Sequence, residues 1–373
     1  MVRTVGRDGR PAGEETRPGL HGVLVVPMVV ILAALLLAGM LPVGVVLADT
    51  GAQSGAAPGD AGSKKAGARE MKFLFSAYGQ EARKGLFSAI GNVLLGPDPL
   101  AKMDRPHGVA VAPNGNFYVT DTNMRMVFVF GPDGKYVKTF GQQRPTPLRS
   151  PTGIAIDAAT GKVYVSDPLW NQVFVYNADG KLLKRLGTER NKEAGKPGEF
   201  LRPSGIAVDS QLGRIYVVDT ENHRVQMFDR DGQFVGTFGK RGSGDGEFNF
   251  PTHVTVDKQG KVYVADTLNF RVQVFDADGK FLFKFGKLGD AAGDLARPKG
   301  ITVDNLGRIF VSDAYFQNVQ AFDQSGKVEF YLGEPGVEDG KFLLPAGMAV
   351  DGRQRLYIAD SENHRVQVFL MGN

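Results

Sequence analysis

Short apolar segments, closed by glycine or aspartate, follow one another along most of this chain. In the clearest copy, residues 203–239, four of them occur in succession: GIAVD, GRIYVVD, HRVQMFD and QFVGTFG. Each is rich in Val, Ile, Tyr and Phe, which is typical of short β-strands. Asp231 and Gly232 join the third and fourth segments, and Asp-Gly is a strong hairpin signal because both turn positions need positive φ. The pattern predicts a four-stranded antiparallel meander.

This unit recurs six times. A proline opens each copy, at Pro106, Pro151, Pro203, Pro251, Pro298 and Pro345. An aspartate ends the second segment of each copy, at Asp121, Asp167, Asp219, Asp266, Asp313 and Asp360. A single meander cannot bury both of its faces, and a repeat of this length with four strands is the signature of propeller blades around a channel. We therefore predict an all-β, six-bladed β-propeller over residues 71–373.

The two ends of the repeat region complement each other. The last copy stops after its third segment, HRVQVFLMGN, whereas residues 71–79, MKFLFSAYG, resemble a fourth strand with no blade before it. We expect the N-terminal strand to complete the C-terminal blade and close the ring, which removes an open sheet edge.

Three segments precede the propeller. Residues 1–21 form a polar, arginine-containing tail, 22–48 contain no charged residue, and 49–70 are an Ala, Gly and Ser-rich linker. The span 22–48 is long enough to cross a bilayer, and the arginines before it predict a cytoplasmic N-terminus with an extracytoplasmic propeller. The alternative is a signal segment cleaved near Ala48, which predicts a secreted protein.

The amino-acid composition excludes several kinds of chemistry. The chain has no cysteine, which excludes disulfides, thiolate chemistry, cysteine-ligated zinc and covalently attached c-type haem. Its net charge of +4 over 373 residues is too small to indicate nucleic-acid binding by itself.

One pentapeptide connects the repeat to a family. Asn-His-Arg-Val-Gln occurs at 222–226 and 363–367, with a near match at 268–273. The chain resembles bacterial NHL-repeat propellers over nearly all of 106–373. The resemblance implies the fold but not the activity, because such propellers host both binding modules and enzymes. Three blades depart from the motif asparagine, with Met124, Trp170 and Phe316.

Antiparallel alternation brings the residues after each opening proline to one channel mouth. They are His107, Thr152, Ser204, Thr252, His253 and Lys299. The resemblance extends to peptidyl-hydroxyglycine lyase propellers, which imply three zinc-binding histidines after such prolines. Only His107 matches that pattern and His253 stands one position later, so they are weak metal candidates. We predict no cofactor and no catalytic residue.

Two recurring features favour a structural role. An Asp and an Arg five residues apart occur at 219 and 224, 266 and 271, and 360 and 365, so we expect a pair that fixes the loop of each blade. His223 and His364 belong to the same motif, and we expect them to be structural too.

Large apolar residues on loops indicate a partner face. The candidates are Met124, Trp170, Phe270, Tyr315 and Phe316. The alternative is that these side chains fold back between blades. The sequence thus predicts a membrane-tethered scaffold for a protein or peptide. The alternatives are a metal-dependent enzyme, lyase-like or lactonase-like, with its site at the channel, and a module that binds RNA or another polyanion.

Overall fold

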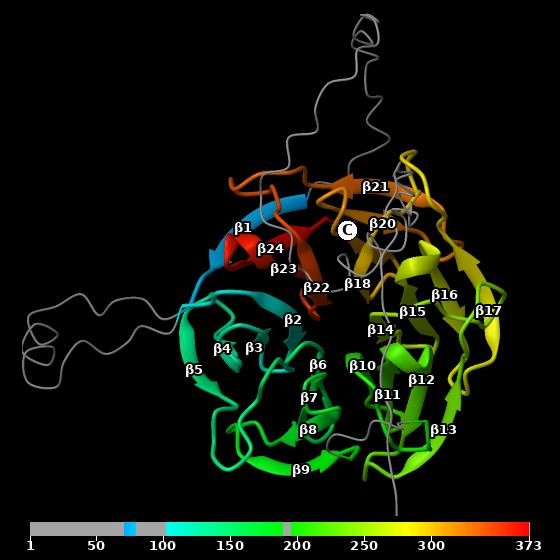
Figure 1. Cartoon of the computed structure of the whole chain (residues 1–373). Helices are drawn as coiled ribbons and strands as arrows, with labels where there is room; N and C mark the ends of the chain where they lie inside the picture. Colours follow the sequence, from blue (N-terminus) through cyan, green and yellow to red (C-terminus); the bar gives the residue numbers. More distant parts are fainter. Residues whose placement is uncertain (1–70, 80–101, 189–194, 373) are drawn as a thin grey trace, which may run out of the picture. The chain divides into compact units, whose positions relative to one another are not determined.

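A computed structural model describes residues 71–79, 102–188 and 195–372. They form six four-stranded antiparallel sheets arranged as blades around a channel (Figure 1), which confirms the predicted all-β propeller. The tail 1–21, the apolar span 22–48 and the linker 49–70 lie outside these residues. In the part of the chain that the structure describes, no helix is both long and apolar enough to cross a membrane.

Blades one to three are consecutive meanders. Blade one contains β2 (Pro106–Val111), β3 (Phe117–Asp121), β4 (Met126–Phe130) and β5 (Tyr136–Phe140). Blade two contains β6 (Ile154–Ile156), β7 (Val163–Asp167), β8 (Gln172–Tyr176) and β9 (Leu182–Leu186). Blade three contains β10 (Pro203–Asp209), β11 (Arg214–Asp219), the 3₁₀ turn η1 (Thr220–Asn222), β12 (Arg224–Phe228) and β13 (Phe234–Phe238).

Blades four to six continue the ring. Blade four contains β14 (His253–Val256), β15 (Val262–Asp266), η2 (Thr267–Asn269), β16 (Arg271–Phe275) and β17 (Phe281–Phe285). Blade five contains β18 (Pro298–Val303), β19 (Ile309–Asp313), β20 (Asn318–Phe322) and β21 (Val328–Leu332). Blade six contains β22 (Pro345–Val350), β23 (Arg355–Asp360), η3 (Ser361–Asn363), β24 (Arg365–Met371) and, from the other end of the repeat region, β1 (Met71–Ala77).

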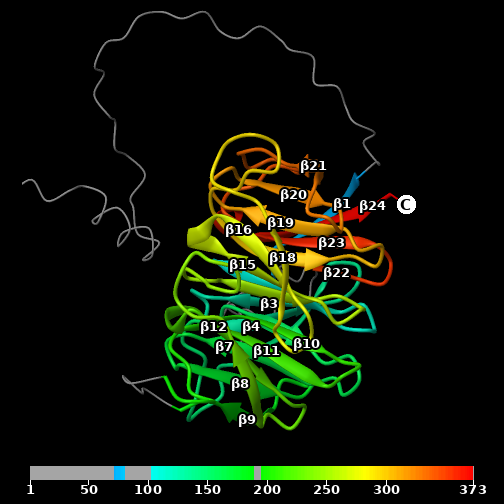
Figure 2. The same cartoon turned by 90° about the vertical axis from the view of Figure 1, so that its right-hand side faces the viewer.

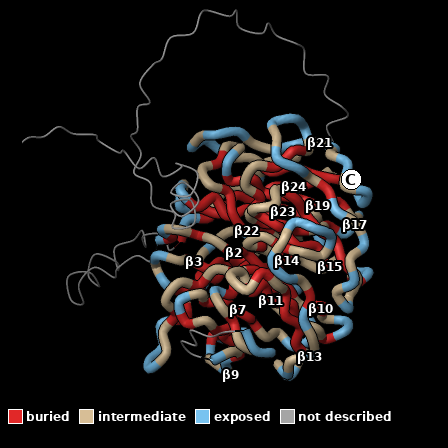
Figure 3. Tube along the Cα trace, turned by 45° about the vertical axis from the view of Figure 1, so that its right-hand side comes forward, coloured by how far each residue is buried: buried red, intermediate tan, exposed pale blue. Residues whose placement is uncertain are grey.

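The burial of each strand depends on its place in the blade. Every residue of the middle strands β7 and β8 is buried, whereas the outer strand β9 alternates between half-buried and exposed positions. Figure 3 shows the same gradient, with buried segments inside and exposed ones at the periphery. Neighbouring blades pack face to face, so their middle strands need apolar side chains on both sides. For that reason these strands are runs of apolar residues in the sequence.

The N-terminal strand completes the last blade, as expected. β1 pairs antiparallel with β24, with Phe73 opposite Phe369 and Ala77 opposite Val366. The Phe73 and Phe369 rings meet edge to face, with 5.7 Å between the ring centroids. In Figure 1, β1 lies beside β24 at the outer edge of blade six. The pairing gives hydrogen-bond partners to the backbone N–H and C=O groups at the outer edge of β24.

A belt of hydroxyl groups joins the blades around the channel. We call the first strand of each blade, which lines the channel, its inner strand, and the boundary between neighbouring blades a seam. At every seam, a Ser or Thr of one blade donates a hydrogen bond to a backbone carbonyl at the start of the inner strand of the next blade. The six pairs are Thr120 with Thr152, Ser166 with Ser204, Ser204 with Thr252, Thr267 with Pro298, Ser312 with Ala346, and Ser361 with Pro106.

The inner strands approach closely at this belt. A Cβ atom placed on Gly108 would lie only 2.4 Å from the Thr152 carbonyl oxygen of the next blade. This explains the glycine two residues after most of the opening prolines. Blade four is the exception, because His253 occupies that position.

Candidate functional site

The propeller has two faces of different construction. All inner strands begin at the face that carries the interblade loops and the turns between second and third strands, which we call the loop face (Figure 2). The six residues predicted at the channel mouth stand at or just before the start of an inner strand on this face: His107, Thr152, Ser204, Thr252, His253 and Lys299.

The three hydroxyl residues among them are engaged in the seams. Ser204 Oγ lies 2.7 Å from Thr220 Oγ1 and donates to the Thr252 carbonyl. Thr252 Oγ1 donates to the Lys299 carbonyl at 3.1 Å, and Thr152 Oγ1 lies 3.2 Å from Ser166 Oγ. Ser204 and Thr252 thus join neighbouring inner strands, and Thr152 contacts the Ser166 hydroxyl that makes the same connection from blade two.

The two histidines are uncharged at neutral pH. Burial is the main cause that lowers the pKa of His107 to about 3, with further contributions from Lys299, His253 and Arg105. Burial alone lowers the pKa of His253 to about 4. Nδ1 of His253 is buried and has no hydrogen-bond partner among the described residues. His253 thus acts on His107, although blades four and one are on opposite sides of the ring.

Lys299 is the centre of a cationic group. Burial first, and then the positive charges of Arg297, Arg105 and Arg202, lower the pKa of its ammonium to about 8. The side chain is half-buried. Among the described residues no hydrogen bond or ion pair engages its Nζ. A half-buried ammonium surrounded by other cations is typical of a site that binds negative charge.

Each of these arginines stands immediately before an opening proline. They belong to alternate blades, with Arg105 in blade one, Arg202 in blade three and Arg297 in blade five. Arg105 forms an ion pair of 3.0 Å with Glu362, and Arg202 one of 3.2 Å with Glu221. The sequence prediction missed all three arginines. The signal that could have found them is Arg-Pro at three of the six openings.

No group of three His, Asp or Glu side chains able to hold a metal ion occurs in the part of the chain that the structure describes. The blade aspartates do not serve that purpose either. They are buried and accept several hydrogen bonds each from the loops around them, as in blades one and three.

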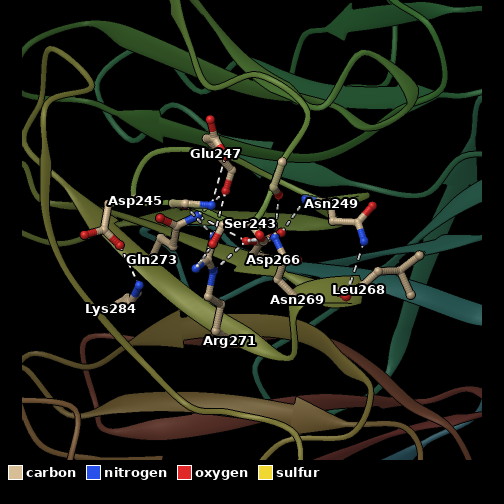
Figure 4. Close-up of polar contacts among 12 residues, drawn as sticks. Ser243, Asp245, Glu247, Asn249, Asp266, Leu268, Asn269, Arg271, Gln273 and Lys284 are labelled. Carbon is tan, nitrogen blue, oxygen red and sulfur yellow. Dashed lines mark hydrogen bonds and ion pairs between the residues drawn. The ribbon is translucent and has the colours of Figure 1, made fainter.

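Figure 4 shows one of these aspartates, Asp266, at the centre of its polar network. Its carboxylate accepts hydrogen bonds from the backbone of Asn249 and the side chains of Asn269, Arg271 and Gln273. The Arg271 guanidinium, 2.8 Å from Asp266, also donates to the carbonyls of Ser243, Gly244 and Glu247 in the interblade loop. Asp219 with Arg224 and Asp360 with Arg365 form equivalent pairs. The structural interpretation of the Asp–Arg motif is confirmed.

The motif histidines also stabilise loops. His223 Nδ1 accepts a hydrogen bond of 3.1 Å from the Phe250 backbone, and the two rings meet edge to face. His364 Nδ1 contacts the Asp104 carbonyl oxygen. Both histidines have left-handed backbone conformation and close their 3₁₀ turns.

The structure separates the predicted partner residues into two groups. Trp170 is 5% exposed, and its Nε1 donates to the Pro147 carbonyl at 2.8 Å. The Arg149 guanidinium lies 3.6 Å from the centre of its ring. Met124 is half-buried against the core between blades six and one. For Trp170 the packing interpretation therefore describes the structure, and its ring is not an exposed anchor.

The second group remains accessible. Tyr315 is 70% exposed, and its ring rests edge to face on that of Phe316, which is half-buried. Phe270 is half-buried as well. Leu169, at the same loop position in blade two as Tyr315 in blade five, is 62% exposed. Asp313 Oδ1 accepts the Tyr315 backbone N–H at 2.9 Å, so the exposed ring stands on a hydrogen-bonded turn.

Four segments match the family model described as NHL repeat: residues 103–130, 200–228, 248–275 and 342–369. The chain contains NHL repeats. They lie in blades one, three, four and six, and three of these four carry the Asp–Arg pair. Blades two and five, outside the matches, carry Trp170 and Phe316 at the asparagine position.

Similar curated proteins share short segments with this chain. Protein brain tumor of Drosophila melanogaster is 46% identical over 59 residues, which cover 16% of this chain and 6% of that protein. Protein lin-41 of Caenorhabditis elegans is 54% identical over 44 residues, which cover 12% of this chain and 4% of that protein. The chain thus spans only a small part of the length of these relatives.

Solved propellers share the fold over most of the described chain. A streptogramin B lyase has a TM-score of 0.53 at 13% identity, covering 72% of this chain and 94% of the lyase. A gluconolactonase from Xanthomonas campestris has a TM-score of 0.55 at 16% identity, and the match covers 80% of this chain and 98% of the gluconolactonase. At such identities the likeness concerns the fold alone.

Proposed function

We propose that this NHL-repeat propeller is a binding scaffold whose loop face takes a protein or peptide partner. The observation that carries the proposal is the exposure of Tyr315 on a turn held by Asp313. An aromatic ring held in place before binding loses little conformational entropy when a partner covers it, and aromatic residues dominate the binding energy of many interfaces.

Leu169 adds a second apolar contact on the same face, in blade two. Blades two and five lie on opposite sides of the channel, so a partner that covers both loops spans the mouth. An extended peptide or a protein loop has the length for this.

A comparison of three full-chain proteins tests the scaffold function. Wild type, Tyr315→Ala and Tyr331→Ala are used to capture partners from native extract, with quantitative mass spectrometry. Tyr331 is a matched control, because it is 66% exposed but lies on the outer strand β21 of the same blade. We expect Tyr315→Ala to lose a protein that wild type and Tyr331→Ala both retain.

Two outcomes would contradict the scaffold function. One is equal recovery of every protein by all three variants. The other is partner recovery that disappears after ribonuclease treatment, which would indicate RNA as the bound species.

The placement of the propeller is a separate part of the proposal. The charge-free span 22–48 after an arginine-containing tail supports a membrane anchor with the propeller on the extracytoplasmic side. Mass spectrometry of the native N-terminus tests it. A mature chain that starts at Asp49 would indicate a cleaved signal and a secreted protein instead.

A further inference from the structure

We propose that the channel mouth is an anion-binding site, in which the Lys299 ammonium, supported by Arg105, Arg202 and Arg297, holds a single phosphate or carboxylate group. The site lies on the loop face, and the backbone of Arg297 is hydrogen-bonded to Asp313, which also holds the Tyr315 turn.

The first argument is the convergence of cations from different blades. Lys299 and Arg297 come from blade five, Arg105 from blade one and Arg202 from blade three, and all four stand at the loop-face start of an inner strand. The positive charges of the three arginines act on the Lys299 ammonium. Segments far apart in the sequence have thus brought like charges together at one end of the channel. Such an arrangement raises the free energy of the empty fold, because like charges repel more strongly where water is partly excluded.

The second argument is the lack of an internal counterion for Lys299. Only positive groups act on its ammonium, and neither a carboxylate nor a hydrogen-bond acceptor of the described residues engages it. Glu362 pairs with Arg105, Glu221 pairs with Arg202 and Asp313 acts on Arg297, but no carboxylate of the described residues pairs with Lys299. Half-buried charge is normally paired, so an unpaired ammonium in a channel is best explained by an anion from outside.

The third argument is the rigidity of the setting. The Lys299 carbonyl accepts a hydrogen bond from Thr252, and the neighbouring Gly300 N–H donates to Ser312 Oγ at 2.8 Å. A Cβ on Gly300 would lie 2.2 Å from the Ala346 carbonyl oxygen, so the inner strands of blades five and six are in close contact here. The backbone that carries Lys299 is thus held in place before an anion binds, which favours capture of the anion.

The neighbouring histidines set the character of the site. The Lys299 charge acts on His107 of β2, and both His107 and His253 of β14 are neutral at pH 7 because burial lowers their pKa. They add polar groups to the wall without adding charge. The charge that titrates near neutral pH is that of Lys299, whose pKa of about 8 leaves it mainly protonated.

Thermal unfolding of the full chain tests the site, with inorganic phosphate and acetate compared with chloride at equal ionic strength. A ligand that binds only the folded state raises the melting temperature. We expect phosphate or acetate to stabilise wild type, and Lys299→Gln to lose this effect. Lys258→Gln is the matched control, because Lys258 is exposed on the opposite face in the turn from Asp257 to Gly260.

The Lys299→Gln variant should also differ from wild type without added anion. In chloride alone, Lys299→Gln should melt at a higher temperature than wild type, because the substitution removes repulsion from three arginines.

The pH dependence of binding is a further test. Phosphate binding by wild type should weaken about tenfold per pH unit above the pKa of Lys299, whereas the arginines keep their charge.

A glutamate hexapeptide distinguishes the source of the anionic group. Binding of the peptide well above that of acetate, with loss in Lys299→Gln, indicates an acidic group of a polypeptide, and phosphate binding that exceeds both indicates a small phosphate ligand. Equal anion effects in wild type and Lys299→Gln, or none in wild type, would overturn the site. Because Tyr315→Ala leaves these cations in place, failure of the scaffold function and failure of the anion site are separate results.

Discussion

The Ser361 hydroxyl donates a hydrogen bond of 2.6 Å to the carbonyl oxygen of Pro106, 255 residues away in the sequence. It joins the last blade to the first at the channel, while β1 completes the last blade at the periphery. The ring is therefore closed at both its inner and outer radius.

Replacing Ser361 by Ala should weaken this closure. The Pro106 carbonyl would be left buried without its partner, which costs about 1–3 kcal/mol. Urea unfolding measures the change. Ser325→Ala is the control, because Ser325 lies on an exposed hairpin and its substitution should change the unfolding free energy by less than about 0.5 kcal/mol. Equal effects of the two substitutions would show that the seam bond does not contribute to closure.

Truncation of Trp170 should lower the stability of the propeller much more than truncation of its neighbour Leu169. Trp170 packs against Phe174 and under Arg149, so Trp170→Ala should lower the unfolding free energy by about 3–5 kcal/mol. Leu169→Ala, at an exposed position, should change it by less than about 0.5 kcal/mol. Side-by-side denaturation decides. A nearly unchanged Trp170→Ala protein would contradict the packing described here.

The two ion pairs of blade four in Figure 4 differ in environment. Asp266 and Arg271 are buried, whereas Asp245 and Lys284 are both about half exposed. Asp266→Asn should cost about 3–5 kcal/mol, because it leaves the guanidinium charge without its partner. Asp245→Asn should cost less than about 1 kcal/mol, since solvent screens exposed pairs. Chemical denaturation at neutral pH compares them, and similar costs would refute the assigned role of Asp266.

The two channel histidines should make the propeller less stable as the pH falls below neutrality. The folded-state pKa values of His107 and His253, about 3 and about 4, lie below the value of 6.5 expected in the unfolded chain. The unfolded state therefore binds more protons, and stability present above pH 6.5 is lost as the pH falls. Each histidine contributes about 1.4 kcal/mol per pH unit in this range.

Urea unfolding between pH 7 and pH 5 measures that slope. The variant His253→Gln should lose the share of one histidine and keep that of His107. An unchanged slope in the variant would show that His253 does not titrate as its burial implies.

Much of this fold could be predicted because its determinants are local. The apolar alternation, the Asp-Gly hairpins and the opening prolines act within a few residues of one another. The strands of each blade can therefore be predicted from the sequence of that blade alone. The unmatched segment 71–79 and the incomplete last blade required only counting strands. The Asp–Arg motif could be interpreted too, because five residues bridge a single turn and repetition implied a structural role.

The side-chain environments were decided by the ring. Nothing near Trp170 in the sequence shows that its indole packs against Arg149 and Pro147, because the interblade loop that supplies them folds back over blade two. The cationic group at the channel mouth depends on Arg105, Arg202, Arg297 and Lys299, which three different blades contribute. Their proximity follows from the closure of six blades around a narrow channel, a long-range property that no local pattern encodes.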